Sequence, residues 1–244
     1  MSWRARMLGV LPRRARLPVR YSYERRFRHL GAEMAVLRRL VRPGSTAVDV
    51  GAGVGLYSYG FAKFCARVEA FEPNPQSAAI IRAHGHKRIA VHPEALSSEA
   101  GTTDLFLPSD KAGTHPSAVT LERRDGSGQR IKVTTATLDS FAFTDVSLLK
   151  IDVEGHERKV LRGARELLRR ERPVLMVEVE QRHLDVPIMD VLDEIVGFGY
   201  EGQFLDGSRL VPLQEFDVQR HQAVDLGVLA SSYLNNFFFT PTDG

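Results

Sequence analysis

Hydrophobic residues along the chain form two patterns: short apolar runs, and longer stretches with the spacing of an amphipathic helix. The short runs predict strands at 47–50, 67–72, 89–92, 146–151 and 173–179. The helical stretches follow most of these runs, at 57–64, 76–84, 160–168 and 188–198. Because strands alternate with helices, the sequence predicts a doubly wound, mostly parallel α/β sheet. The last apolar runs, 200–204 and 234–239, predict an antiparallel hairpin at one edge.

The residues before the first predicted strand divide into two parts. Apolar residues between 23 and 41 step by four and three positions, which predicts an amphipathic helix that covers the domain and ends at Pro43. Residues 1–22 are rich in arginine and lack a stable period, so we expect a loosely ordered arm. The predicted organisation is an arm (1–22), a helix (23–42) and one α/β domain (43–244), with a polar loop inserted at 108–130.

Composition limits the class of protein. A length of 244 residues, with 43% hydrophobic and 26% charged residues, is ordinary for one globular domain with additions. The single cysteine, Cys65, cannot form an internal disulfide, and no apolar run approaches the roughly 20 residues of a membrane span. These features favour the cytoplasm.

Charge is distributed unevenly along the chain. Residues 1–42 contain twelve Arg, no Lys and two Glu, a net charge of +10, whereas the other 202 residues carry 21 basic and 28 acidic side chains, a net charge of −7. An acidic body argues against an enzyme with a broad basic face for nucleic acid. We expect the basic arm to be a solvated tail, with peripheral contact with an anionic membrane as the alternative.

Three glycines spaced two apart, Gly51, Gly53 and Gly55, follow the first strand and precede the first helix. A strand, a glycine turn and a helix open a nucleotide-binding α/β unit, in which a ligand approaches the backbone closely. The turn departs from the dinucleotide pattern, because Leu56 stands at the expected third glycine and Asp49 precedes the turn. A tight turn without a ligand is the alternative.

Acidic residues follow the predicted strands, at Asp49, Glu72, Glu94 and in the segment 152–156. The carboxyl ends of parallel strands meet at one edge of the sheet, where ligands bind. An acidic edge disfavours a diphosphate but suits the amino group and sulfonium of S-adenosylmethionine. Glu72 comes 23 residues after Asp49, within the range for a carboxylate that binds ribose hydroxyls.

Four motifs resemble the FkbM family of S-adenosylmethionine-dependent methyltransferases: VDVGAGVGLYS (48–58), AFEPNP (70–75), EAL (94–96) and LKIDVEGHE (149–157). The resemblance covers about residues 44–180, and the family often has Asn where this chain has Gly53. It implies a Rossmann-like class I methyltransferase fold with a C-terminal antiparallel hairpin. It also implies O-methylation of a hydroxyl on a sugar, a glycolipid or a natural product.

The resemblance implies a cofactor site at the strand ends. Asp49 and the glycine loop lie on the methionine side, Glu72 binds the ribose and Glu94 lies near the adenine. The implied cofactor-binding residues are Asp49, Gly51, Gly53, Tyr57, Glu72, Pro73, Glu94 and Ala95.

Methyl transfer to a hydroxyl needs an aligned acceptor and a general base for its proton. Asp152 and His156 are the preferred candidates and Glu154 is the next, although a cap or surface role is the alternative for His156. Asp152, Glu154 and Glu178 could also bind Mg²⁺, but we favour carboxylates that hold loops by accepting backbone amides, with no metal. Lys150 is expected to pair with one of these acids.

Two hypotheses stay open. The first is an O-methyltransferase (EC 2.1.1.-) that uses S-adenosylmethionine to modify a small-molecule or glycolipid acceptor. The second is a non-catalytic protein with the adenosylmethionine-binding fold, whose basic arm serves a partner. A nicotinamide oxidoreductase is disfavoured because the third glycine is missing.

Overall fold

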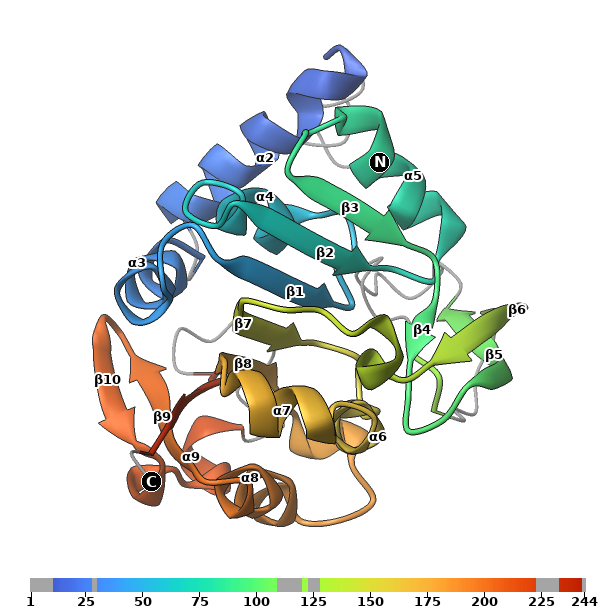
Figure 1. The fold of residues 1–244 in the computed structure, drawn as a ribbon. Helices are drawn as coiled ribbons and strands as arrows, with labels where there is room; N and C mark the ends of the chain where they lie inside the picture. Colours follow the sequence, from blue (N-terminus) through green and yellow to red (C-terminus); the bar gives the residue numbers. More distant parts are fainter. Residues whose placement is uncertain (1–10, 28–29, 109–119, 123–127, 223–232, 243–244) are drawn as a thin grey trace.

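The computed structural model describes residues 11–27, 30–108, 120–122, 128–222 and 233–242. Within these residues an eight-stranded sheet has the order β10-β9-β11-β8-β7-β1-β2-β3 (Figure 1). Its strands are β1 (Thr46–Val50), β2 (Arg67–Phe71), β3 (Ile89–His92), β7 (Val146–Ile151), β8 (Val174–Glu178), β9 (Tyr200–Asp206), β10 (Arg209–Pro212) and β11 (Asn236–Pro241).

The sheet has a parallel part and an antiparallel edge. Strands β3, β2, β1, β7 and β8 pair in parallel, whereas β11 is antiparallel to both β8 and β9, and β10 is antiparallel to β9. The antiparallel pairing of β9 with β11 confirms the relation predicted for 200–204 and 234–239. Strand β10 was not predicted, because Leu210 and Val211 are its only apolar residues before a proline ends it.

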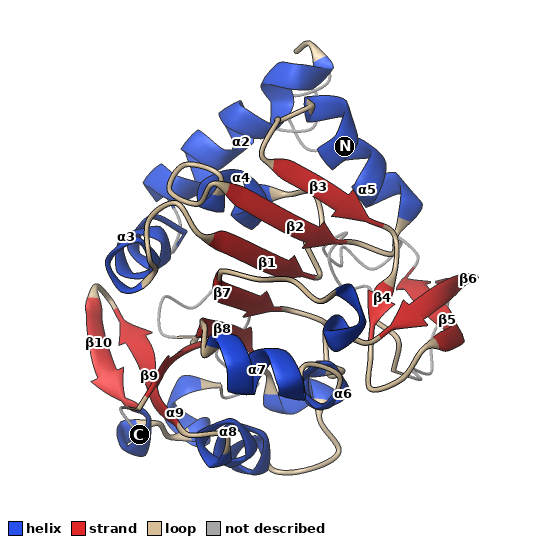
Figure 2. Ribbon diagram, viewed as in Figure 1, coloured by secondary structure: helices blue, strands red, loops and turns tan. Residues whose placement is uncertain are grey.

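Helices cover both faces of this sheet (Figure 2). They are α2 (Arg13–Phe27), α3 (Leu30–Leu40), α4 (Leu56–Phe61), α5 (Pro75–His84), α6 (Glu157–Arg162), α7 (Arg165–Glu171), α8 (Ile188–Gly197) and α9 (Val218–His221). Alternate residues of one strand enter different cores: Leu175 and Val177 pack with α6, α7 and α8, whereas Met176 packs with α3 and α4. In the part of the chain that is described, no helix is long and apolar enough to cross a bilayer.

A three-stranded sheet stands beside the end of β3. It consists of β4 (Ala95–Leu96), β5 (Gly101–Pro108) and β6 (Gly128–Ala136), in the order β4-β6-β5. Strands β5 and β6 are antiparallel and flank the predicted insertion. Residues 109–119 and 123–127 of that insertion lie outside the described residues, and 120–122 are the described residues between the two strands.

The N-terminal region differs from the prediction. Helix α2 begins at Arg13, inside the segment expected to be loosely ordered, and the helix predicted at 23–41 is divided between α2 and α3. Burial of Leu17 and Tyr21, which are 3% and 5% exposed, stabilises the earlier start. Pro18 lacks the N–H that would bond the Arg14 carbonyl, and His84 Nδ1 donates to this oxygen instead, at 2.9 Å.

The helix predicted at 160–168 is also divided, between α6 and α7. At Gly163 a Cβ atom would lie 2.1 Å from the backbone oxygen of Ser97. The Gly163 carbonyl accepts a hydrogen bond from the Asp139 N–H at 2.9 Å. Tertiary contact therefore ends the helix at a position where the apolar period continues.

Candidate active site

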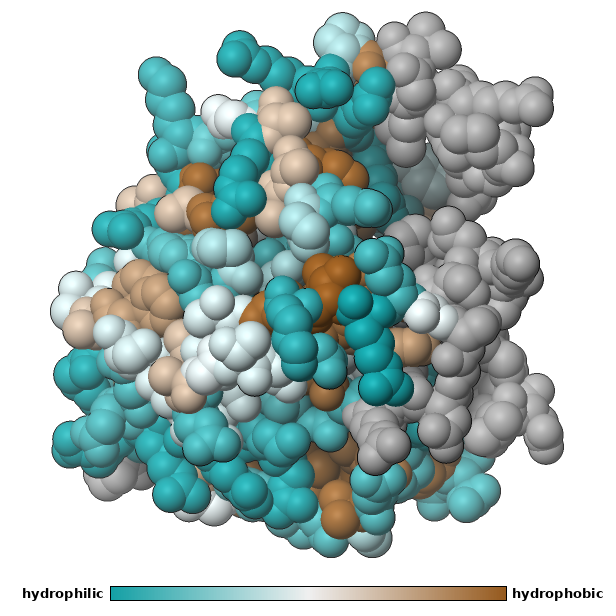
Figure 3. All heavy atoms as spheres, turned by 90° about the vertical axis from the view of Figure 1, so that its right-hand side faces the viewer, coloured by the Kyte–Doolittle hydropathy of each residue, from teal (hydrophilic) through white to brown (hydrophobic). Residues whose placement is uncertain are grey.

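A cavity of about 280 Å³ lies at the edge of the sheet where the parallel strands end. Figure 3 looks onto the side toward which β1, β2, β3 and β7 point; its described residues are mostly hydrophilic, with hydrophobic patches between them. The cavity lining includes Gly51, Gly53, Tyr57, Glu72, Pro73, Glu94 and Ala95. Seven of the eight predicted cofactor-binding residues are therefore brought together, and the eighth, Asp49, is fully buried at the end of β1.

The glycine turn brings two loops into backbone contact. Gly51 has a φ of +75°, and a Cβ atom there would lie 1.9 Å from the carbonyl oxygen of Asp152. Gly53 has a φ of +56°, and a Cβ atom there would meet nothing within 4 Å. The first glycine is therefore required by packing and conformation, whereas the second leaves open space beside the cavity.

Glu72 lies directly after β2 and connects this loop to the next one. Its Oε2 accepts from the Gly53 N–H at 2.6 Å, and its Oε1 accepts from the Asn74 N–H at 2.8 Å. Burial raises the pKa of Glu72 to about 7, although both backbone hydrogen bonds lower it. A carboxylate held in this way can accept further hydrogen bonds from ligand hydroxyls.

Asp49 offers an acceptor atom beneath the turn. Its Oδ2 accepts from Ser58 Oγ at 2.5 Å, whereas its buried Oδ1 has no hydrogen-bond partner in the described part of the chain. Burial raises the pKa of Asp49, and the positive charge of Lys150 counteracts this effect. A buried carboxylate oxygen without a donor fits the ammonium group of an amino-acid ligand.

Lys150 is the cation at the centre of the site. Its Nζ donates to Asp152 Oδ2 at 3.0 Å, lies 3.7 Å from Asp49 Oδ1, and lies 4.6 Å from the ring centroid of Tyr57. Burial lowers the pKa of Lys150, but Asp152 and Asp49 outweigh it, and the pKa lies above its usual value. The predicted pairing of Lys150 with an acid is confirmed.

The three predicted catalytic residues occupy different places. Asp152 lines the cavity, whereas Glu154 and His156 do not. His156 is buried at the start of α6, with Nδ1 2.6 Å from Glu122 Oε1 and Nε2 3.0 Å from Ser97 Oγ. The hydrogen bond with His156 lowers the pKa of Glu122 to about 2. His156 therefore joins the described part of the insertion to the end of β4, and its catalytic role stays a prediction.

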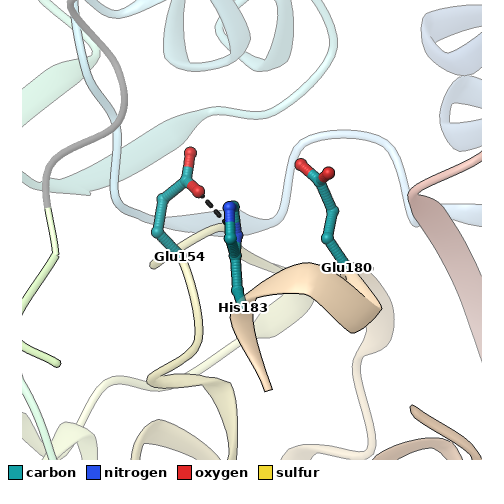
Figure 4. Close-up of side chains that lie close together, drawn as sticks. All are labelled: Glu154, Glu180 and His183. Atoms are coloured by element: carbon teal, nitrogen blue, oxygen red, sulfur yellow. Dashed lines mark ion pairs between the residues drawn. The ribbon is translucent and has the colours of Figure 1, made fainter. Parts of the chain in front are cut away.

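Among the described residues, two groups of side chains could hold a metal ion, and one of them includes Asp152 of the cavity lining. Figure 4 shows Glu154, Glu180 and His183, whose ligand atoms lie within 4.8 Å of one another. His183 Nδ1 lies 2.7 Å from Glu154 Oε2, and Arg182 Nε lies 2.7 Å from Glu180 Oε2. The positive charge of Arg182 already compensates Glu180, so this group fits a divalent cation poorly.

The second group consists of Asp152, Glu154 and Glu178. Lys150 occupies one oxygen of Asp152, and Asn235 Nδ2 donates to Glu178 Oε1 at 2.8 Å. Burial and the neighbouring Asp152 raise the pKa of Glu178 well above its usual range, which favours a neutral carboxyl group. Because Lys150 and Asn235 already occupy oxygens of this group, no metal is carried into the proposed mechanism.

Sequence reasoning missed the residues that reach the cavity from outside the strand ends. Arg20 and Glu24 of α2 line it, as do Leu105 of β5 and Leu121 of the insertion. No motif marks these residues, because the packing of α2, β5 and the insertion against the domain brings them there. The sequence could have indicated Ser58 as a hydrogen-bond partner of Asp49, since Ser58 lies in the first turn of α4, close to the end of β1.

Comparisons of sequence identify relatives of this chain. The Methyltransferase FkbM domain family model matches residues 49–201. The chain is 30% identical over 174 residues to the 31-O-demethyl-FK506 methyltransferase FkbM of Streptomyces tacrolimicus, an alignment that covers 56% of this chain and 66% of that protein.

Comparisons of structure show a shared fold. The crystal structure of methyltransferase FkbM from Methylobacillus flagellatus KT has a TM-score of 0.52 and 17% identity, and the match covers 86% of this chain and 51% of that chain. The crystal structure of MtNAS in complex with MTA and tNA has a TM-score of 0.50 and 15% identity, with coverage of 98% and 69%. The chain thus spans 66% of the curated FkbM relative and 51% of the solved one. Because the family model matches more than half of its length, the chain belongs to the FkbM methyltransferase family.

Proposed function

We propose that this protein transfers a methyl group from S-adenosylmethionine to a hydroxyl of a sugar, a glycolipid or a natural product. One observation carries the proposal: a cavity at the strand ends joins the glycine loop, Glu72 and Glu94 to Asp152. The strand that leads into this loop carries the buried Asp49, whose Oδ1 accepts no hydrogen bond among the described residues. The name of the Streptomyces relative describes methylation at an oxygen of FK506, which supports an oxygen acceptor.

Side chains of opposite charge and hydrogen-bond acceptors would hold the cofactor. Asp49 Oδ1 would bind its ammonium group, Glu72 would accept from its ribose hydroxyls, and Ala95 would border its adenine. When it is bound, S-adenosylmethionine supplies an electrophilic methyl group. The turn at Gly53 leaves room for a ligand beside the backbone, because no heavy atom lies within 4 Å of a Cβ position there.

Asp152 is the proposed general base. It lines the cavity, and Lys150 fixes its Oδ2 at 3.0 Å, so its other oxygen can accept the proton of an acceptor hydroxyl. Because Lys150 is 1% exposed and is held by two carboxylates, it keeps Asp152 in one position. Positioned general bases contribute about 10²- to 10⁴-fold to rates.

Binding of S-adenosylhomocysteine, followed by titration calorimetry, tests the cofactor assignment. We expect saturable binding to the full chain, and at least about tenfold weaker binding for Asp49→Asn, because a charge–charge contact is lost. Asp104→Asn is the matched control, since Asp104 lies on β5 and does not line the cavity. Absence of binding at millimolar ligand would contradict the proposal.

A second measurement separates binding from chemistry. Label from methyl-labelled S-adenosylmethionine is followed into a panel of sugars, glycolipids and hydroxylated natural products. We expect Asp152→Asn to retain binding of S-adenosylhomocysteine and to lose about 100-fold or more in transfer. Unchanged transfer in this variant would exclude Asp152 as the base.

A further inference from the structure

A second cavity, of about 270 Å³, adjoins the cofactor cavity. The two share Glu24, Leu56 and Tyr57 in their linings, so a ligand in one lies next to a ligand in the other. The second cavity also lies at the edge where the strands end, because Asn236 in its lining pairs with Glu178, the last residue of β8.

The lining of this cavity combines an apolar part with a polar part. Leu30, Leu56, Leu205 and Leu234 supply the apolar surface. Among the polar residues, Glu33 accepts from the Tyr57 hydroxyl at 2.6 Å and from Asn236 Nδ2 at 2.9 Å. The lining thus resembles that of a pocket for a ligand with both hydroxyl groups and hydrocarbon.

The hydrogen bond to Glu33 fixes the orientation of the Asn236 amide. Burial raises the pKa of Tyr57 well above its usual value, so its hydroxyl stays protonated and donates to Glu33. Because a carboxylate only accepts, the nitrogen of Asn236 faces Glu33. The buried Oδ1 of Asn236 is left without a hydrogen-bond partner among the described residues. An unpaired buried acceptor is costly, and a hydroxyl of a ligand can satisfy it.

The charged side chains that line the second cavity indicate which class of ligand it can bind. The described residues that line the second cavity include the carboxylates of Glu24 and Glu33 and no Lys or Arg. The cofactor cavity differs, because Arg20 and Lys150 line it. Among the described residues of this lining, a phosphate or carboxylate on the ligand would meet two carboxylate side chains and no Lys or Arg, which is unfavourable in a partly buried site.

We infer that the second cavity binds the methyl acceptor, and that this acceptor is an uncharged polyhydroxylated molecule with an apolar part. Asn236 determines specificity by accepting from one hydroxyl of the acceptor, and the reacting hydroxyl enters the cofactor cavity, where Asp152 lies, past Tyr57, which lines both cavities. This inference rests on the proposed function, since it assigns the cofactor to the first cavity.

The test uses octyl β-D-glucopyranoside as the probe, below its micelle-forming concentration, with the full chain saturated with S-adenosylhomocysteine. We expect saturable binding by calorimetry. Asn236→Leu should weaken it about tenfold through loss of the amide and should leave S-adenosylhomocysteine affinity within about twofold. Gln203→Leu is the matched control, because Gln203 lies on the neighbouring strand β9 and lines neither cavity.

A second probe tests the charge argument. Octyl β-D-glucuronide has the same tail and ring but carries a carboxylate, and we expect at least about tenfold weaker binding. If S-adenosylhomocysteine fails to bind the wild type, the proposed function itself fails. If S-adenosylhomocysteine binds but octyl glucoside does not, the acceptor inference is overturned while the proposed function stands. The same holds if the two glycosides bind equally well and the Asn236→Leu and Gln203→Leu variants bind octyl glucoside equally well.

Discussion

At the scale of single residues, Glu72 makes cofactor binding depend on pH. The residue is 5% exposed, and burial raises the pKa of its carboxyl group to about 7 from an ordinary value of 4.5. Between these values the folded chain holds a proton that the unfolded chain has lost, so this group's contribution to stability falls as the pH rises from 4.5 to 7. Hydroxyl donors of a ribose favour the ionised form, so binding should release this proton below pH 7.

We therefore expect the affinity for S-adenosylhomocysteine to fall as the pH is lowered from 8 to 6, by up to about tenfold per pH unit below the pKa. Calorimetry in two buffers of different ionisation enthalpy would measure the released proton. Glu72→Gln cannot ionise, so it should bind more weakly and lose the part of the pH dependence that comes from Glu72. A variant with the wild-type profile would assign the dependence to another group.

At the scale of elements, the correct predictions are those that depend on burial within a single segment of the chain. The strand predicted at 89–92 has the same bounds as β3, and the acidic residues after the strands lie at one edge because parallel strands end together. The patterns that failed depend on contacts between segments. The lack of a stable period suggested a loosely ordered arm, but burial of Leu17 and Tyr21 stabilises α2 through Pro18, and α2 then places Arg20 and Glu24 at the cavity.

The contacts of Lys150 could be predicted only in part from the sequence. Asp49 and Lys150 are register partners on the neighbouring parallel strands β1 and β7. A sequence can suggest this pairing once the strand order is assumed, because each residue is the last but one of its strand. It cannot give the 4.6 Å contact with Tyr57, which depends on how α4 packs on the sheet.

The break between α6 and α7 gives a prediction at the same scale. Gly163→Ala should destabilise the fold by about 1–3 kcal/mol, because the new methyl group would overlap the Ser97 backbone, which cannot move freely. Gly197→Ala is the matched control, since a Cβ atom there meets nothing within 4 Å and the residue ends α8. This control should be neutral or stabilise by up to about 1 kcal/mol. Chemical denaturation measures both, and equal midpoints would show that Gly163 is not required by packing.

At the scale of the whole molecule, part of the positive charge of the N-terminal region lies on the exposed surface of α2. Arg13, Arg14, Arg25 and Arg26 are exposed on α2, and Phe27 on the same helix is 64% exposed. Arg26 lies beside Phe27, with its guanidinium carbon 5.4 Å from the ring centroid. Arginines and an exposed aromatic residue on one helix are typical of helices that lie on anionic membranes. The alternative expectation of peripheral membrane contact therefore stays a prediction, now tied to the surface of α2 and no longer to the whole arm.

Deleting residues 1–20 would be a poor test of that prediction, because it would remove Arg20 from the cofactor cavity as well as the positive charge. Replacing the four exposed α2 arginines by glutamine keeps the buried side of the helix. Each arginine near an anionic surface contributes about 1 kcal/mol, so partitioning onto phosphatidylserine vesicles in a sedimentation assay should fall at least about tenfold. The control replaces four exposed arginines on α6 and α7, Arg162, Arg165, Arg169 and Arg170, which gives the same change in net charge. An equal loss in both variants would mean that binding follows net charge, and no loss in either would mean that α2 does not meet the membrane.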